Sequence, residues 1–470
     1  MRKSIWLVSA GLFAIATPAF AQQTDTDKSG AQPTDGATAE AAAVDDKATT
    51  NAPQDAGDII VTATRRNEAL SDVPLAVSAV TAEQLENTGA SDIKQLQQVS
   101  PSLLVSSTQS EAGASTARIR GIGTVGDNPG LESSVALFID GVYRSRTSVG
   151  LTELGQVERV EVLRGPQGTL FGRNASAGLI SVITARPKFV FGINGEATVG
   201  NYDFRRFELG ATGPISETLA FRVDGVMVKR DGLLKDIISG RRVNDRDRWL
   251  VRGQLLYKPT EDFSLRLIGD YTKRNEECCA APYLESQDFV NSGGTVFPAP
   301  STIRQIIQAL TLNPNAVQDQ PFERKVTISP NRSFRSDVKD WGLSAEAVYD
   351  FGGAELTSIS AYRYNNYIRG TDVDYGLLDL IYRPDNGDSF NRFKTFSQEA
   401  RLQGEAFGGK LDWLIGGYYA NEKLRSQDSL RFGNDYTRYA NCLTALNFAS
   451  TAANIAAGGL AGAATPLYAQ

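Results

Sequence analysis

The sequence contains no histidine and only three cysteines among its 470 residues. Without histidine, Ser-His and Cys-His nucleophilic catalysis is excluded, and most zinc sites lose a usual ligand. The sequence has no paired-carboxylate motif that could provide another catalytic site. We therefore expect that the protein is not an enzyme and has no catalytic residue, no bound metal and no covalent cofactor. An odd number of cysteines leaves at least one without a partner in the chain. The adjacent Cys278 and Cys279 either form a vicinal bridge or are incidental loop residues.

Positive charge and long apolar runs are also lacking. The formal net charge is −6, so the composition gives no sign of a nucleic-acid partner. After the N-terminus, no stretch reaches the roughly 18 apolar residues of a membrane-spanning helix. A membrane role would therefore depend on a β-barrel, whose signal is alternation. The 44 glycines, 16 tyrosines and 21 phenylalanines suit turns and aromatic girdles.

The first 56 residues show two compositions that do not belong to a folded domain. Residues 1–21 have Arg2 and Lys3, then an apolar stretch, then the small-x-small sequence at 19–21, as in a secretory signal peptide. The apolar stretch is too short for the alternative, a transmembrane anchor. Residues 22–56 contain almost no large apolar side chain and are predicted to be a disordered linker.

The segment Asp58–Arg66, DIIVTATRR, ends this polar region abruptly. Its β-branched residues favour an extended backbone. Two interpretations are open. The segment is either the first strand of the following domain or a strand that a partner protein adds to its own sheet.

Residues 67–187 carry the local signals of a small α+β domain. Thr81 and Gln84 form a capping box, which predicts a helix that Gly89 closes. The pattern predicts a second helix from about residue 91 to residue 99. Asp140-Gly141, between apolar residues in VALFIDGVY, predicts a hairpin.

The stretch Gln156–Pro187, QVERVEVLRGPQGTLFGRNASAGLISVITARP, reads as strand, turn and strand. Its glycines lack the spacing of a phosphate-binding loop. Together with the preceding motifs RIRG and LFIDGVY, this stretch resembles the plug domain of TonB-dependent outer-membrane receptors. That family imports scarce nutrients, most often ferric siderophores. The resemblance implies an α+β plug domain inside a transmembrane antiparallel β-barrel of about 22 strands.

After Pro187 the sequence changes to amphipathic strands. Their lengths suit tilted transmembrane strands of about 9–11 residues. A soluble β-sandwich would also alternate, but with a polar outer face. Short connections alternate with long ones, except that Asn201–Asp203, the first of the second set, is also short; this is the outer-membrane pattern. Residues Ile303 to Leu310 predict a helix in the longest loop. With about nine strands, residues 188–470 are predicted to be the N-terminal part of a truncated barrel. The predicted strands are Asn194–Gly200, Phe204–Thr212, Leu219–Lys229, Arg248–Tyr257, Phe263–Tyr271, Trp341–Tyr349, Leu356–Tyr364, Phe396–Gln403 and Leu411–Tyr419.

The resemblance also implies partners and a location. Residues 57–66 would be the TonB box, and TonB with its inner-membrane energising complex would be the partner. The receptor would lie in the bacterial outer membrane, in contact with lipid, with its N-terminus in the periplasm. The cargo would be a ferric siderophore or a similar iron complex. Another cargo (glycan, vitamin or aromatic compound) and a non-energised barrel or adhesin are the alternatives. The predicted TonB-binding residues are Asp58, Ile59, Ile60, Val61, Thr62 and Ala63.

In the family, two plug arginines pair with two barrel glutamates. Their counterparts here are Arg120 and Arg164, with Glu399 as a glutamate candidate. Strand alternation places Glu399 in the lumen, where the alternative role is that of a solvated charge.

The outward plug loops should contact the ligand. Tyr143, Arg144 and Arg146 suit an anionic or catecholate-like ligand. Alternatively, these arginines pair with carboxylates of the barrel wall.

Overall fold

The computed structural model describes residues 59–107, 113, 115–124, 128–146, 153–284, 287–292 and 295–456. The predicted signal peptide 1–21, the linker 22–56 and Asp58 lie outside the described residues. Among the helices of the described part, none has the length and apolar character needed to span a membrane.

The plug domain is built on a five-stranded sheet in the order β3-β8-β9-β6-β7. Apolar clusters cover both faces, with Val160 and Ile180 on one side and Leu163 and Leu179 on the other. Burial on both faces explains why the sequence of β9 is a nearly continuous apolar run. The strands are β3 (Val77–Thr81), β6 (Val135–Ile139), β7 (Val142–Arg144), β8 (Val157–Arg164) and β9 (Gly178–Thr184).

Short elements surround this sheet. The predicted capping box is confirmed, because Thr81 and Gln84 each accept a hydrogen bond from the other's backbone N–H at the start of α1. The predicted hairpin is also confirmed, with Asp140 and Gly141 at φ 50° and 74°. The remaining elements are β1 (Ile60–Val61), β2 (Glu68–Ala69), α1 (Ala82–Thr88), β4 (Leu103–Ser107), β5 (Ser115–Ile119) and α3 (Gly168–Phe171).

The prediction of a second helix from residue 91 to residue 99 is wrong in its extent. Only a 3-10 turn, η1 (Gln95–Gln98), forms there. The Gln95 side chain accepts hydrogen bonds from the backbone N–H groups of Ser91 and Asp92, and Asp92 caps the Gln95 N–H in return. Such local side-chain bonds compete with helix formation.

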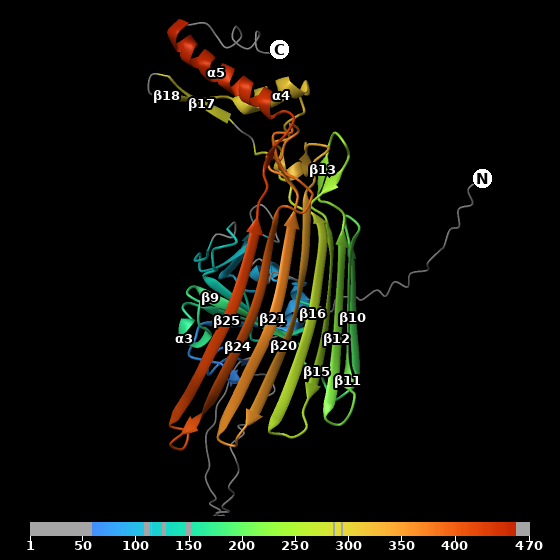
Figure 1. Ribbon diagram of the computed structural model, residues 1–470, viewed down its shortest axis with the longest axis vertical. Coiled ribbons are helices and arrows are strands. Elements are labelled where there is room, and N and C mark those ends of the chain that lie inside the picture. The colour runs from blue at the N-terminus through green and yellow to red at the C-terminus, as the bar shows by residue number, and fades with distance from the viewer. Residues whose placement is uncertain are drawn as a thin grey trace, which may run out of the picture. The chain divides into compact units, whose positions relative to one another are not determined.

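The rest of the chain is dominated by a nine-stranded antiparallel sheet whose strands lie in chain order (Figure 1). All nine predicted strands are confirmed. All the long connections lie at one end of the sheet, together with the short turn 201–203, and the other short connections lie at the opposite end. The strands are β10 (Gly192–Gly200), β11 (Phe204–Pro214), β12 (Leu219–Arg230), β15 (Arg246–Tyr257), β16 (Phe263–Glu277), β20 (Arg335–Asp350), β21 (Ala354–Arg369), β24 (Phe390–Ala406) and β25 (Leu411–Gln427).

Several strands continue beyond their predicted ends on the long-loop side. β16 runs to Glu277 and β25 to Gln427. A transmembrane strand needs about 9–11 residues, so the surplus of a 17-residue strand extends past the apolar layer. Alternation did not predict these extensions because both of their faces carry polar residues.

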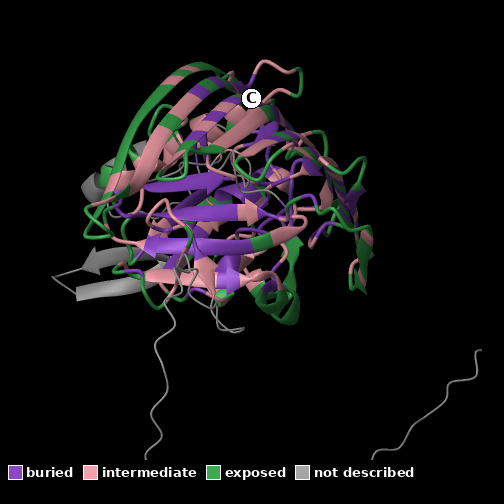
Figure 2. Cartoon of the chain, turned by 90° about the horizontal axis from the view of Figure 1, so that it is seen from below, coloured by how far each residue is buried: buried purple, intermediate pink, exposed green. Residues whose placement is uncertain are grey.

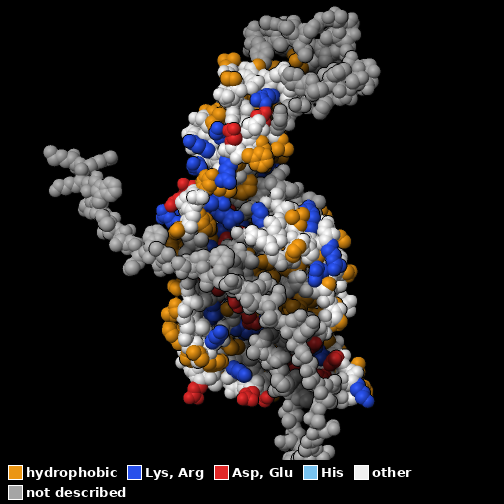
Figure 3. All heavy atoms as spheres, turned by 180° about the vertical axis from the view of Figure 1, so that it is seen from behind, with side chains coloured by type: hydrophobic (Ala, Val, Ile, Leu, Met, Phe, Trp, Pro, Cys, Tyr) orange, Lys and Arg blue, Asp and Glu red, His pale blue; other side chains and the backbone are white. Residues whose placement is uncertain are grey.

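The two faces of the sheet differ in polarity. On β12, Arg222 and Asp224 are buried on the inward face, while Val223 and Met227 are exposed on the other face. Hydrophobic side chains cover the flank of the sheet (Figure 3). Stacked rings of Trp249 and a neighbouring tyrosine lie near the long-loop end. This polarity is the reverse of that of a soluble β-sandwich. The buried plug strands lie on the inward side (Figure 2).

The long loops contain structure of their own. The predicted loop helix is confirmed as α4, with Ile306, Ile307 and Leu310 buried, although Ile303 is half exposed. The elements are β13 (Leu234–Asp236), β14 (Arg242–Val243), β17 (Gln287–Ser292), β18 (Thr295–Pro300), α4 (Thr302–Thr311), η2 (Pro321–Glu323), β19 (Lys325–Val326), β22 (Thr371–Asp372), β23 (Ile381–Arg383), β26 (Arg431–Phe432) and α5 (Tyr436–Ala456).

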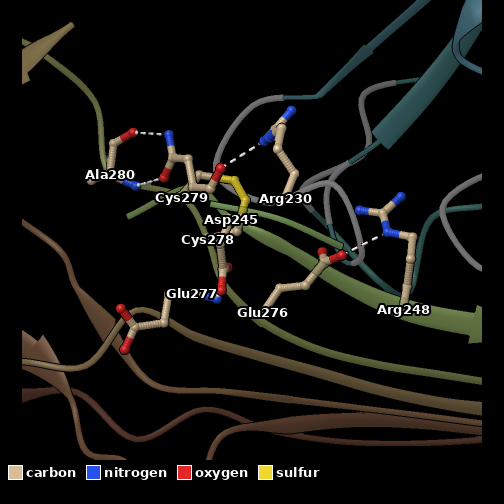
Figure 4. Close-up of a disulfide and its surroundings, with 9 residues drawn as sticks. Arg230, Asp245, Arg248, Glu276, Glu277, Cys278, Cys279 and Ala280 are labelled. Atoms are coloured by element: carbon tan, nitrogen blue, oxygen red, sulfur yellow. Dashed lines mark hydrogen bonds and ion pairs between the residues drawn. A yellow bond between two sulfur atoms is a disulfide. The ribbon is translucent and has the colours of Figure 1, made fainter. Parts of the chain in front are cut away.

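The adjacent cysteines Cys278 and Cys279 form a disulfide directly after β16 (Figure 4). Of the two possibilities left open by the sequence, the structure therefore has the vicinal bridge. The neighbouring Ala280 is held by two hydrogen bonds with the Asn244 side chain. Cys442 lies in α5.

Candidate functional site: the plug–wall interface

The extended segment predicted to be the TonB box is folded into the plug. β1 pairs with β2, and Val61 and Ala63 are completely buried beside Phe138 and Leu163. In this conformation the segment is thus the first strand of the plug, as one of the two interpretations predicted. Its binding to TonB stays a prediction.

A buried carboxylate holds the middle of this segment. The Thr62 backbone N–H and hydroxyl donate to Glu161 Oε1 over 2.8 and 3.1 Å. Arg159 Nε donates to the same oxygen over 2.8 Å. Glu161 is only 1% exposed. A buried carboxylate needs such hydrogen-bond donors. The hydrogen bonds between Thr62 and Glu161 therefore hold both residues in place.

Two arginines extend the segment's contacts to the inward face of the nine-stranded sheet, which we call the wall. Arg65 Nη2 lies 3.5 Å from Glu399 Oε2 on β24, and its guanidinium stacks 4.1 Å from the Phe171 ring. Arg66 Nη1 lies 2.7 Å from Asp412 Oδ1 on β25, and its Nη2 donates to two wall carbonyls. The segment 62–66, here named the box clasp, is therefore bound to both the plug and the wall.

The structure does not bring the three predicted anchoring residues together. Glu399 faces the plug, but its arginine partners are Arg65 and Arg401. Arg164 donates to two carbonyls of its own domain, and Arg120 lies in a turn with φ 52°. In the described part of the chain, neither Arg120 nor Arg164 pairs with Glu399. Their anchoring role stays a prediction.

The wall instead supplies arginines to plug carboxylates. Asp140 Oδ1 lies 3.2 Å from Arg266 Nη2, and both side chains are almost fully buried. Arg266 also donates to Thr184 over 2.7 Å and to Gln254 over 2.9 Å. Burial alone would raise the pKa of Asp140, but Arg266, Arg252 and hydrogen bonds from Thr184 outweigh it and lower the pKa.

A second ion pair, again between a plug carboxylate and a wall arginine, lies further along the wall. Glu153 Oε1 is 3.4 Å from Arg248 Nη1, and Arg248 Nε is 2.6 Å from Glu276 Oε1 on β16 (Figure 4). Burial raises the pKa of Glu153, outweighing Arg248. Sequence reasoning missed both pairs. In the sequence analysis, Asp140 was interpreted only as a turn residue of the predicted hairpin.

Two of the three predicted ligand residues, Tyr143 and Arg146, have partners within the protein. The Tyr143 hydroxyl accepts from Asn174 over 2.7 Å, and burial raises its pKa to about 12. Arg146 pairs with Glu422 of β25 over 3.2 Å. This is the second of the two interpretations given above, in which the arginine pairs with a carboxylate of the barrel wall. Arg144 is buried, and burial lowers its pKa to about 10. Ligand contact by these residues stays a prediction.

In the described residues, no three or more His, Cys, Asp or Glu side chains are grouped so as to hold a metal ion. The site offers buried charge pairs between the plug and the wall.

Residues 69–179 match the family model described as the TonB-dependent Receptor Plug Domain. The match lies inside the predicted plug domain, 67–187, whose boundaries stay a prediction. The chain is 30% identical to the pesticin receptor of Yersinia pestis over 194 residues, which is 41% of this chain and 27% of that protein. It is 34% identical to the catecholate siderophore receptor Fiu of Escherichia coli over 133 residues, 28% of this chain and 17% of that protein.

The fold is shared with solved siderophore receptors. The crystal structure of the ferric yersiniabactin uptake receptor FyuA from Yersinia pestis superposes with a TM-score of 0.58 at 20% identity. The superposition covers 76% of this chain and 50% of that receptor. Fiu from Escherichia coli superposes with a TM-score of 0.56 at 18% identity, over 79% of this chain and 49% of Fiu. The predicted fold class is confirmed: a plug domain with nine strands of a receptor-type antiparallel sheet.

Proposed function

We infer that this chain is part of a TonB-dependent outer-membrane receptor and that the whole protein imports a ferric siderophore. The observation that carries the inference is the plug-domain match at 69–179, in a domain joined by buried ion pairs to the inward face of the sheet. The chain spans about half of the solved receptors it resembles, so the transport activity is proposed for the whole protein.

The geometry supports energised import with the N-terminus in the periplasm. Ligand binds on the long-loop side. TonB captures the segment around Ile60 and pulls, which breaks the contacts of Thr62, Arg65 and Arg66. The plug then shifts and releases the ligand. The apolar outer face of the sheet contacts membrane lipid.

The names of the relatives favour an iron complex over other cargo. They include catecholate siderophore and ferrioxamine receptors. None of the contacts described above selects one complex, since Tyr143 and Arg146 are engaged within the protein. Gene-independent uptake of every iron complex tested below would favour a glycan or vitamin cargo instead.

Uptake measurements in a deletion strain test the proposal. Cells with and without the gene would be given ⁵⁵Fe bound to a catecholate, a hydroxamate or yersiniabactin. We expect uptake of at least one complex to depend on the gene and to stop when a protonophore removes the proton gradient. Gene-dependent uptake that survives the protonophore would instead establish a non-energised barrel.

A further inference from the structure

Six basic side chains lie on the outer face of the nine-stranded sheet, near its long-loop end. Alternation along the strands places them there, because they share a face with the exposed side chains of Leu267, Leu343 and Phe396. In the register of the strands they form three directly opposite pairs of like charge. The pairs are Lys273–Lys339 between β16 and β20, and Lys394–Lys423 and Arg392–Arg425 between β24 and β25. We name these six residues the basic band.

The charges of the basic band repel one another. Directly opposite side chains of an antiparallel pair have Cβ atoms about 5 Å apart, and like charges in such a pair are destabilising. Within the part of the chain that the structure describes, none of the six side chains forms an ion pair. Asp247 and Asp337 share the face but lie further toward the long loops, and Asp337 is itself paired with Arg335 over 2.6 Å. Three pairs of like charge without a described counter-charge indicate a site that an anion completes.

An apolar hollow of about 630 Å³ lies on the same outer face, on the membrane side of the basic band. Its floor includes Gly253 and Gly269, which are directly opposite one another on β15 and β16. Two opposite glycines leave a gap in the layer of outward side chains. Apart from its chain neighbours, no described atom lies within 4 Å of the position that a Cβ at Gly253 would take. Large apolar side chains form the rim: Val223, Leu255, Leu267, Leu343, Tyr362 and Phe396.

A row of aromatic residues separates the basic band from the hollow. Tyr271, Trp341 and Tyr364 occupy directly opposite positions on β16, β20 and β21. Aromatic rows of this kind lie at the membrane–water interface. Gly269 and Lys273 are four residues apart, which is about 13 Å along a strand. One leaflet of the hydrocarbon core is about 15 Å thick, so the band and the hollow fit within the depth of a single leaflet.

A lipid with an anionic head matches both features. A free anion would use the basic band but not the hollow. A second copy of the chain, docked symmetrically through this face, would bring two basic bands together. Phosphate groups form strong charge-assisted hydrogen bonds with arginine and lysine. The band extends over the four strand spacings from β16 to β25, about 19 Å, which is wider than one phosphate and suits a head that carries two.

We propose that the basic band and the hollow together bind one phosphorylated glycolipid of the outer leaflet. Its phosphates lie among the paired cations, and one acyl chain fills the hollow. The bound phosphates offset the repulsion within the three pairs. This site goes beyond the proposed import function and takes from it only the outward direction of the long loops.

Lipid titration tests the basic band. The whole protein, stripped of lipid in a non-ionic detergent, would be titrated with bisphosphorylated lipid A, and bound lipid would be counted by native mass spectrometry. We expect wild type to bind this lipid at least tenfold more tightly than dephosphorylated lipid A. Lys273→Gln/Lys339→Gln should weaken binding at least tenfold. Lys258→Gln/Lys410→Gln removes the same charge from exposed positions in the short turns and should stay within twofold of wild type.

Three results of this titration would overturn the proposal. They are equal affinity for the two forms of lipid A, an equal loss in both lysine variants, and tighter binding of phosphatidylglycerol than of lipid A. The last result would show that the site takes a phospholipid.

Filling the hollow tests the acyl-chain part of the site. Gly253→Leu places a side chain in the hollow, whereas Gly225→Leu adds the same volume to the same face of β12, outside the hollow. We expect the first variant to weaken lipid A binding at least fivefold and the second to leave it within twofold. Unchanged binding by Gly253→Leu, or an equal loss in both variants, overturns the assignment of the hollow.

Thermal unfolding separates lost binding from misfolding. Without lipid, Lys273→Gln/Lys339→Gln should unfold at or above the wild-type temperature, because a repelling pair has been removed. Lipid A should raise the midpoint of wild type, since a ligand that binds only the folded state stabilises it. It should raise the midpoint of the variant much less. A lipid-free midpoint of the variant well below that of wild type overturns the repulsion on which the site depends.

The import function and the lipid site fail separately. The lipid measurements use purified protein and need neither TonB nor an iron complex. If uptake does not depend on the gene while lipid A binds as expected, the import function alone is wrong. If uptake depends on the gene and the lipid expectations fail, the lipid site alone is wrong.

Discussion

At the scale of single residues, the interface depends on buried charges whose partners lie far apart in sequence. Asp140 and Arg266 are 126 positions apart and meet across the plug–wall boundary. Taking two charges out of water is costly, so such a pair fixes geometry more than it adds stability. Breaking it leaves one buried charge without compensation.

Arg266→Met should therefore destabilise the docked plug by about 3–5 kcal/mol. Asp140 would lose its nearest cation, and Arg252 would offset the buried charge only in part. The thermal unfolding midpoint of the whole protein in detergent measures the effect. Asp140→Asn combined with Arg266→Met should recover part of the loss, because no uncompensated charge remains. A double variant that is less stable than the single one would contradict this account.

At the scale of elements, the box segment shows that one stretch has two structural roles. β1 pairs with β2 by backbone hydrogen bonds, and an extended strand can form the same bonds with a partner sheet. The β-branched residues predicted from the sequence suit both roles. The sequence therefore left the choice open, and the folded chain shows the plug-bound state.

Ile60→Pro should abolish uptake while leaving ligand binding intact, since proline removes a backbone donor that a paired strand needs. Binding of ⁵⁵Fe-siderophore to cells and its accumulation inside them would be measured separately. Ile60→Val, which keeps both the donor and the β-branched shape, serves as the control. Normal accumulation in the proline variant would contradict the prediction that residues 58–63 bind TonB.

The loop between β21 and β24 contains a pH-sensitive pair. Asp372 is 1% exposed, and one oxygen each of Asp372 and Asp374 has no hydrogen-bond partner. Burial and the neighbouring Asp374 raise the pKa of Asp372 to about 8 from 3.8. Asp379 contributes less and is itself paired with Arg332. The folded loop thus holds a proton that the unfolded loop has lost between about pH 4 and pH 8.

Because the folded state binds more protons in that window, loop stability should fall as the pH rises toward 8. Hydrogen exchange of residues 371–383, corrected for intrinsic rates, should show less protection at pH 8.5 than at pH 6. Asp372→Asn, which cannot ionise, should reduce this difference. Equal protection of the wild-type loop at both pH values would contradict the expected coupling.

At the scale of the whole molecule, the direction of the sheet follows from its connections. All long loops lie at one end, together with the short turn 201–203, and the remaining short turns lie at the other. Long loops face outward in outer-membrane barrels. The plug contacts the inward face.

Surface labelling tests this orientation. Phe322, in the loop after β16, is 98% exposed, and Glu261 lies in the short turn between β15 and β16. In the Cys442→Ala background, Phe322→Cys should react on intact cells with a large maleimide that does not cross the outer membrane. Glu261→Cys should react only after the membrane is opened. The reverse pattern would show that the sheet is inserted the other way.

By itself the sequence determined the features that depend on neighbouring residues. The capping box at Thr81, the hairpin at Asp140-Gly141 and the inward-outward alternation of nine strands were predicted because each is encoded within a few positions. The tertiary structure decided which charges meet. The pairing of Asp140 with Arg266 and of Arg65 with Glu399 depends on how the plug is rotated against the wall. No local period encodes that rotation, because it results from contacts between residues more than a hundred positions apart.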